Sequence, residues 1–200
     1  MINTGRQSAG NQTKNFLGVG SSETIRNPPR LKMNLNPQWI LGFVDGEGCF
    51  WVGIVNVRSK PSKNYPEGFI TKQIQVRFTV SQHKKSINVL YGIKRYFKCG
   101  RIQANKGKEG MKTNPIYDYR VNNIDHLMVK ILPFFEKYSL LTEKRQDFLF
   151  FRKFVMRLSN KEHLMISPET KRFVWDPSKI KKWEKEIENF RKKSCDSSSF

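Results

Sequence analysis

Residues 73–81 alternate between apolar and polar side chains over their whole length, and this alternation is the feature that most limits how the chain can fold. Every second residue of a β-strand points to the same side of its sheet, whereas one face of a helix recurs every three or four residues. One side of the expected strand carries Ile74, Val76, Phe78 and Val80. The other side carries Gln73, Gln75, Arg77, Thr79 and Ser81. The segment therefore predicts a sheet with one buried face and one polar face.

The surrounding segments predict the elements that bury the apolar face. Apolar residues recur at helical spacing near residues 39–44, 87–97, 124–135, 148–158 and 180–190. β-branched and aromatic residues, or an alternating pattern, favour further strands at 49–57, 101–105 and 116–121. The order is helix, strand, strand, helix, strand, strand, helix, followed by extra helices. It is typical of an α+β domain whose antiparallel sheet carries its helices on one face and leaves the other face polar and cationic.

Two details refine this expectation. Asn36 before Pro37, and Asp176 before Pro177, predict capped helix starts, because Asn and Asp side chains accept hydrogen bonds from the first turn and Pro suits the first helical position. The first strand fits less well than the others. Its polar side would be formed by Trp51, Gly53, Val55 and Val57, none of which is polar.

The charge of the chain limits its partners. Its 200 residues carry a net charge of +20, and the segment from Gly48 to Tyr117 holds fourteen Lys and Arg against two Glu, a net +12. A single-sign surface of this kind favours binding to a polyanion over the chemistry of a neutral metabolic enzyme. The three cysteines lie far apart, which supports neither a disulfide framework nor a zinc site. No apolar run approaches the roughly 18 residues needed to span a bilayer, so no membrane association is expected.

An apolar helix that runs directly into alternating acids and glycines is the segment most suggestive of chemistry. It reads Trp39-Ile-Leu-Gly-Phe-Val-Asp-Gly-Glu-Gly-Cys-Phe50, with Gly42 and Gly46 on one helical face. Glu47 would project from the helix end, immediately before the most cationic part of the chain. A carboxylate in that position is suited to hold Mg²⁺ against a phosphodiester.

These residues resemble a known family. Ile40 to Gly48 is similar to the signature of the LAGLIDADG homing endonucleases, and the resemblance extends from about residue 37 to 165. Supporting segments are Phe78-Thr-Val-Ser-Gln-His83, Gly100-Arg-Ile102, Leu132-Pro-Phe-Phe-Glu-Lys-Tyr138, Leu141-Thr-Glu-Lys-Arg-Gln-Asp-Phe148 and Asn160-Lys-Glu-His-Leu164. The resemblance implies the αββαββα LAGLIDADG fold, whose curved antiparallel sheet forms a saddle in the DNA major groove. Leu41 departs from the family, in which this helix position is often smaller.

The resemblance also implies roles for individual residues. Glu47 would be the catalytic, metal-binding carboxylate, with the Gly46 carbonyl as a further ligand of Mg²⁺. Gln82 would position water or metal near the scissile phosphate, and Lys144 would stabilise charge or polarise the attacking water. Arg145 stands next to Lys144 and is the alternative for that role.

DNA sequence would be recognised by the polar sides of the strands, since Arg favours guanine and Gln or Asn favours adenine in the major groove. The expected DNA-contacting residues are Gln73, Gln75, Arg77, Thr79, Ser81, Arg101, Gln103, Asn105, Asp118 and Arg120. The chain contains one copy of the signature, and one Glu47 supplies too few carboxylates to cleave two strands. A symmetric homodimer packed through Gly42 and Gly46 is therefore expected, on a pseudopalindromic target.

The leading functional hypothesis is a Mg²⁺-dependent, intron-encoded, site-specific double-strand DNA endonuclease. Two alternatives on the same fold remain: an RNA maturase that binds group I intron RNA, and a non-cleaving DNA-binding regulator. We expect a flexible arm or leader over residues 1–34, the endonuclease domain over 35–165, and a C-terminal helical extension and tail over 166–200. Members of such a family are typically encoded by organelle introns, which implies a mitochondrion or chloroplast.

Overall fold

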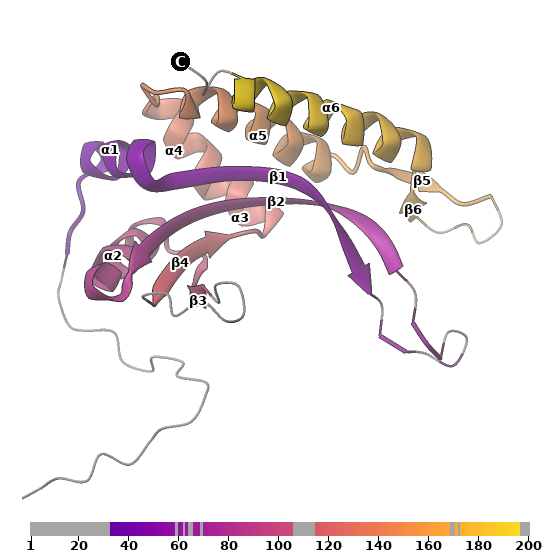
Figure 1. Ribbon diagram of the computed structural model, residues 1–200, viewed down its shortest axis with the longest axis horizontal. Helices are drawn as coiled ribbons and strands as arrows, with labels where there is room; N and C mark the ends of the chain where they lie inside the picture. The colour runs from indigo at the N-terminus through magenta and orange to yellow at the C-terminus, as the bar shows by residue number, and fades with distance from the viewer. Residues whose placement is uncertain are drawn as a thin grey trace, which may run out of the picture.

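The computed structural model describes residues 33–58, 60–61, 63, 66–68, 70–105, 115–168, 171 and 173–196. The expected arm at residues 1–34 and the basic loop at 106–114 fall largely or wholly outside these ranges. The described part is built on a curved antiparallel sheet with helices packed against its apolar face (Figure 1). None of the helices in the described ranges is both long and apolar enough to cross a membrane.

The first helix leads directly into the first strand. Helix α1 spans Pro37–Glu47, and the Asn36 side chain accepts a hydrogen bond of 2.8 Å from the backbone N–H of Gln38, as its position predicted. Strand β1 follows without a loop at Gly48–Arg58 and pairs with β2, Ile70–His83, over its full length. Both strands bend together in one long curved ribbon (Figure 1).

The second half of the sheet repeats the pattern with shorter elements. A 3-10 turn at Lys84–Ser86 leads into α2, Ile87–Phe97, and then into β3, Arg101–Asn105, and β4, Ile116–Val121. The strand order is β1-β2-β4-β3, all antiparallel, and pairing of β2 with β4 begins at Phe78. This is the αββαββα arrangement expected from the sequence.

The helix expected over residues 124–135 is divided into three parts. It consists of α3, Ile124–His126, a π-helical turn at Leu127–Ile131, and α4, Leu132–Lys137. In the π turn the N–H of Leu132 bonds to the carbonyl of Leu127, five residues back. Pro133 has no N–H and therefore cannot donate the hydrogen bond that an α-helix requires at its position. The π turn before it shifts the hydrogen-bond pattern, which changes the carbonyl that is left without a helical donor.

The C-terminal part holds one element pair that the sequence did not predict. Helix α5 spans Lys144–Ser159 and α6 spans Pro177–Asp196, with the Asp176 side chain capping α6 as expected. Between them, β5, Leu164–Ile166, and β6, Phe173–Trp175, form a two-stranded hairpin. The helix of the expected extension over 166–200 is α6. The hairpin before it was not predicted, because three-residue strands are too short to show alternation.

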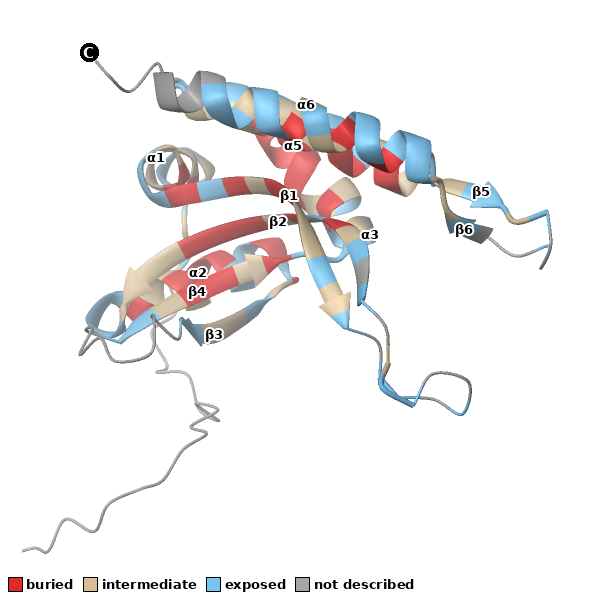
Figure 2. Ribbon diagram, turned by 45° about the vertical axis from the view of Figure 1, so that its right-hand side comes forward, coloured by how far each residue is buried: buried red, intermediate tan, exposed pale blue. Residues whose placement is uncertain are grey.

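The buried residues of the core lie between the sheet and the helices (Figure 2). Aromatic rings pack together at its centre. The Phe50 ring contacts the rings of Phe78, Phe135, Phe148 and Phe151, with centroid distances of 5.1 to 5.4 Å. Aromatic pairs in this distance range stabilise the fold beyond the area they bury. The outer side of α6 is largely exposed (Figure 2). Its buried residues include Ile180, Trp183 and Ile187, and the Trp183 ring contacts the Phe154 ring of α5. The helices thus cover the apolar face of the sheet, and the polar face is available for other contacts.

Candidate active site and nucleic-acid interface

The acidic end of α1 is tied to the loop before α5 by Asp45. The Asp45 carboxylate accepts hydrogen bonds from the backbone N–H of Leu141 at 3.0 Å and from the hydroxyl of Thr142 at 2.6 Å. The backbone N–H of Thr142 donates a third, longer bond of 3.4 Å. Burial raises the pKa of Asp45, but these hydrogen bonds and the nearby Lys144 lower it by more, so that it lies below its ordinary value of 3.8. Asp45 is therefore charged and fully engaged in holding the loop.

The same loop delivers Lys144 to the end of α1. The Thr142 hydroxyl accepts a hydrogen bond from the N–H of Lys144 at the start of α5. The Lys144 ammonium then donates to the Gly46 carbonyl at 3.1 Å. Glu47 is exposed at the next position of α1. Three residues that the sequence assigned to the catalytic centre, Gly46, Glu47 and Lys144, are thus brought together from segments almost a hundred residues apart.

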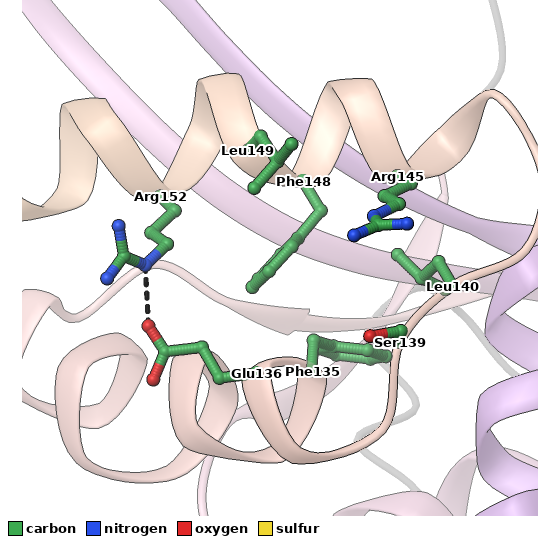
Figure 3. Close-up of a pocket in the computed structure, with 8 residues that line it drawn as sticks. All are labelled: Phe135, Glu136, Ser139, Leu140, Arg145, Phe148, Leu149 and Arg152. Atoms are coloured by element: carbon green, nitrogen blue, oxygen red, sulfur yellow. Dashed lines mark hydrogen bonds and ion pairs between the residues drawn. The ribbon is translucent and has the colours of Figure 1, made fainter.

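Arg145, the alternative to Lys144, lies elsewhere. It projects into a pocket of about 330 Å³ between α4 and α5, whose lining includes Leu140, Phe148 and Leu149 (Figure 3). An ion pair between Glu136 and Arg152 lies at the far side of this pocket. Of the two adjacent cations, Lys144 is the one that reaches the acidic end of α1.

Gln82 lies near the end of β2, where the register with β1 brings it toward α1. Gly48 is paired with Val80. Gln82 lies two residues further along β2, past the last residue paired with β1, and so at the end of β2 nearest the start of β1. Gln82 is half-buried and paired with Tyr117 of β4. Its backbone position is compatible with the role near the scissile phosphate that the family resemblance implied.

The polar face of the sheet carries Arg77 stacked on Trp51. These two residues are direct partners in the β1–β2 ladder, and the Arg77 guanidinium carbon lies 4.1 Å from the centroid of the Trp51 ring. The apolar residues that fitted poorly in the first strand therefore do lie on the polar face. Trp51 serves there as a platform for a cation.

Asp118 is a correction to the expected set of DNA contacts. It is 2% exposed, and its carboxylate accepts hydrogen bonds from Ser81 at 2.7 Å, Asn105 at 3.3 Å and Arg120 at 3.0 Å. A buried carboxylate with three donors is not available to a base edge. Asp118 instead holds three of the other expected readers in place on β2, β3 and β4.

Thr79 is a second correction. It is 8% exposed, and its hydroxyl is buried without a hydrogen-bond partner among the described residues. It stands between Cys49 on β1 and Arg120 on β4 in the ladder. Flanking strands on both sides keep its short side chain below the surface, so direct base contact is not supported.

The other expected readers are accessible. Gln75, Arg101 and Asn105 are exposed, and Gln73, Ser81, Gln103 and Arg120 are half-buried. Arg101 donates to the Gln103 side chain at 3.0 Å, which fixes the orientation of both along β3. The polar face therefore carries accessible guanidinium and amide groups, some of which are oriented by hydrogen bonds to each other.

The face of α1 that was expected to pair with a second chain is open. A Cβ atom added at Gly42 or at Gly46 would meet no atom within 4 Å. Trp39 stacks on Phe43 along the same helix, with ring centroids 4.8 Å apart, and Trp39 is 42% exposed. The neighbouring Leu141 is 88% exposed. An apolar patch with two glycines is thus accessible beside Glu47.

The donors at the end of α1 fit Mg²⁺ rather than a softer metal. Glu47 offers an exposed carboxylate and Gly46 a carbonyl, both of which are the hard oxygen ligands that Mg²⁺ prefers. In the described part of the chain, no three His, Cys, Asp or Glu side chains gather into a metal cage. Mg²⁺ suits such a site, because it usually keeps several waters and binds through one or two carboxylates and substrate phosphates.

Asp45 and Thr142 were not assigned a role from the sequence. The sequence singled out both acids of the helix end, but only Glu47 was given a function. The signal that distinguishes them is helical position: Asp45 comes two residues earlier than Glu47, and therefore on a different side of α1. Which side faces α5 depends on long-range packing.

Comparisons with known proteins agree with this geometry. The family model described as LAGLIDADG endonuclease matches residues 40–155. A protein of Podospora anserina, described as an uncharacterized 50.9 kDa protein in ND4 intron 1, is 36% identical over 132 residues, which cover 65% of this chain and 26% of that protein. The chain spans about a quarter of the length of the curated relatives it matches first.

Two solved structures share the fold. The homing endonuclease I-TnaI is 36% identical, with a TM-score of 0.53 over 66% of this chain and 78% of that one. The meganuclease I-SmaMI, solved bound to uncleavable DNA, is 33% identical, with a TM-score of 0.51 over 66% of this chain and 40% of that one.

Proposed function

Because this chain belongs to the LAGLIDADG endonuclease family, we propose that it cuts double-stranded DNA at a specific site, with Mg²⁺ and as a homodimer. The observation that carries the proposal is the hydrogen bond from Lys144 to the Gly46 carbonyl, next to the exposed Glu47. It joins a carboxylate, a carbonyl and a cation at one end of a cationic sheet. Together these groups can hold Mg²⁺ and stabilise the negative charge that develops during phosphodiester hydrolysis.

Glu47 and the Gly46 carbonyl would hold the metal. When bound, Mg²⁺ supplies a positive charge that stabilises the phosphate as negative charge develops on it. Lys144 donates to the Gly46 carbonyl, and from this position its ammonium would stabilise charge on the phosphate or polarise the attacking water. Gln82 would orient that water from the end of β2.

The polar face of the sheet would hold the duplex. The segment 48–117, which includes β1, β2 and β3, holds fourteen Lys and Arg against two Glu, and this excess favours phosphate binding and a steep dependence of affinity on salt. Arg77, Gln75, Arg101 and Gln103 would contact base edges, and Asp118 would orient their neighbours.

Two copies of the chain would complete the site. The open face of α1 at Gly42 and Gly46 allows close approach of a second α1 and brings a second Glu47 next to the first. The I-SmaMI match covers 40% of that chain, which supports a unit about twice the size of this one. An intron origin in an organelle, a mitochondrion or chloroplast, is supported by a relative described as lying in an intron.

A cleavage assay tests the proposal. A plasmid that carries the joined exons flanking the coding intron should be linearised with Mg²⁺ and remain intact with EDTA. Glu47→Gln should lower the cleavage rate at least about 100-fold, the order expected for losing a metal-binding charge, without loss of DNA binding. Glu188→Gln, an exposed change on α6, is the matched control and should cleave normally.

The same assay separates the nuclease from the maturase. If wild type and Glu47→Gln leave the plasmid equally intact while intron RNA is bound tightly, the protein is an RNA-binding maturase. If the wild type binds the target DNA specifically and never cuts it, the protein is a regulator.

A further inference from the structure

Two arginine side chains contact the ring of Trp51 at the outer edge of the sheet. Trp51 of β1 carries Arg77 of β2 on one part of its ring, at 4.1 Å from the centroid. Arg191 of α6 approaches the same ring, with its guanidinium carbon 5.7 Å from the centroid. Two arginines from segments far apart in sequence thus share one indole on the polar face.

Gly53 makes room for this arrangement. A Cβ at Gly53 would lie 2.5 Å from Cη2 of Trp51 and 2.8 Å from a terminal nitrogen of Arg191. The Trp51 ring therefore lies directly over the Gly53 backbone, where any larger residue would displace it. The absence of a side chain at Gly53 fixes the height and tilt of the ring.

Arg191 connects the stack to the C-terminal helix. Its guanidinium donates to the Val52 carbonyl at 2.9 Å, on the outer edge of β1. Helix α6 is held against α5 by the stacked rings of Phe150 and Phe190, whose centroids are 3.9 Å apart. This helix lies beyond residues 40–155, the part of the chain matched by the family model.

Arg77 keeps its hydrogen-bonding capacity. Within the described residues its guanidinium has no hydrogen-bond acceptor, whereas the neighbouring Arg120 is engaged by Asp118. Burial and the charge of Arg120 lower the pKa of Arg77 below its ordinary value, yet an arginine remains charged at neutral pH. A guanidinium stacked on an indole retains its planar fork of donors, and this fork matches the two acceptors of guanine.

We propose that Trp51, seated on Gly53 and supported by Arg191, positions Arg77 to read a guanine, so that the C-terminal helix contributes to target specificity. The inference rests on the proposed function, because it needs a specific DNA target. Trp51 and Arg191 are positioning residues in this account, and Arg77 is the residue that touches the base.

Selection from a randomised duplex library tests the inference with the full-length chain. The wild type should enrich sequences with guanine at one position of the half-site, and Arg77→Ala should lose that preference. Trp51→Leu, Gly53→Ala and Arg191→Ala should each lower the preference for guanine at that position about two- to fivefold, the factor expected for a cation–π contact. Preferences at the other positions should stay unchanged.

A conservative variant of Trp51 and a charge-matched control for Arg191 separate the positioning of Arg77 from the general effect of losing a side chain or a charge. Trp51→Phe keeps an aromatic platform and should retain most of the guanine preference. Lys192→Ala removes the same charge as Arg191→Ala from an exposed neighbour on α6 and should leave the preference unchanged. Arg191 is itself exposed, so its replacement tests the idea without a large cost to folding.

The outcomes are distinct. If Arg77→Ala loses the guanine while Trp51→Leu and Arg191→Ala keep it in full, the positioning role is wrong and the proposed function stands. If the wild type enriches no sequence, both the proposed function and this inference fail.

Discussion

Asp45 lies at the acidic end of α1 and sets the position of Lys144 through one carboxylate. It accepts hydrogen bonds from Leu141 and Thr142, and Thr142 in turn accepts one from the Lys144 N–H. Without the carboxylate, three donors of the loop would lose their partner. Lys144 would then be positioned only by the start of α5 and by its own hydrogen bond to the Gly46 carbonyl.

Replacing Asp45 by Ala should therefore affect both stability and activity. At pH 7 we expect a loss of about 1–2 kcal/mol in the free energy of unfolding, typical of hydrogen bonds to a charged group. Because the folded-state pKa lies below 3.8, this stabilisation is present above that pH and disappears as the pH falls through the folded pKa. Urea titrations at pH 7 and pH 3 check this, with Glu188→Ala as control. An equal difference between wild type and variant at both pH values would contradict it.

Residue roles on the polar face were only partly predictable. Alternation in residues 73–81 correctly placed Arg77 and Gln75 on that face. It could not show that Asp118 is buried beneath Ser81, Asn105 and Arg120, since this depends on pairing across β2, β3 and β4. Nor could it show that Trp51 covers Gly53, which needs the actual rotamer of the ring.

Helix α6 is attached to α5 by ion pairs as well as by rings. Glu186 accepts hydrogen bonds from Lys153 and from Arg157, the latter at 2.7 Å. Burial raises the pKa of Glu186, but its two cationic partners lower it by more, below the ordinary 4.5. Glu186 therefore remains charged at neutral pH and bridges two turns of α5.

Replacing Glu186 by Ala should loosen this pairing. We expect a loss of about 1 kcal/mol in the free energy of unfolding, at the upper end for a partly exposed ion pair. Glu188→Ala, two residues away on the exposed side, should change stability by less than about 0.5 kcal/mol. Chemical denaturation at neutral pH measures both. The idea fails if the two variants are equally stable.

Element order was predictable because it depends on periodicity, and the exceptions have physical reasons. The helices and the four long strands each have a repeating apolar pattern, and capping residues mark the starts of α1 and α6. The π turn at Leu127–Ile131 keeps a helical pattern and so has no separate signature. The β5–β6 hairpin has strands of three residues, too short for any periodicity to appear.

The proposed homodimer depends on an accessible face of α1. Gly42 is exposed, and a Cβ atom added there would meet no atom within 4 Å outside the adjoining residues and helix backbone. A larger residue should therefore be harmless to the single chain and harmful to a dimer that needs close contact at this point.

Gly42→Leu tests the assembly directly. The isolated chain should keep its stability or gain up to about 1 kcal/mol, since Leu favours a helix over Gly. Dimer formation on target DNA, followed by analytical ultracentrifugation, should be lost together with double-strand cleavage. Lys181→Leu adds the same side chain to an exposed position of α6 and should leave both intact. A wild-type chain that remains a monomer on its specific DNA would refute the homodimer.

The sheet narrows along its length, and this has a consequence for how evenly the molecule can discriminate between targets. Strand β2 starts at Ile70, but its pairing with β4 starts only at Phe78, so the far end of the sheet is a two-stranded ribbon. Such ribbons twist more readily than wider sheets. Side chains on this two-stranded end can therefore be displaced at a lower cost in free energy than side chains on the wider part of the sheet beside α1. We expect substitutions in the outer base pairs of a half-site to be accepted more readily than substitutions near its cleaved centre.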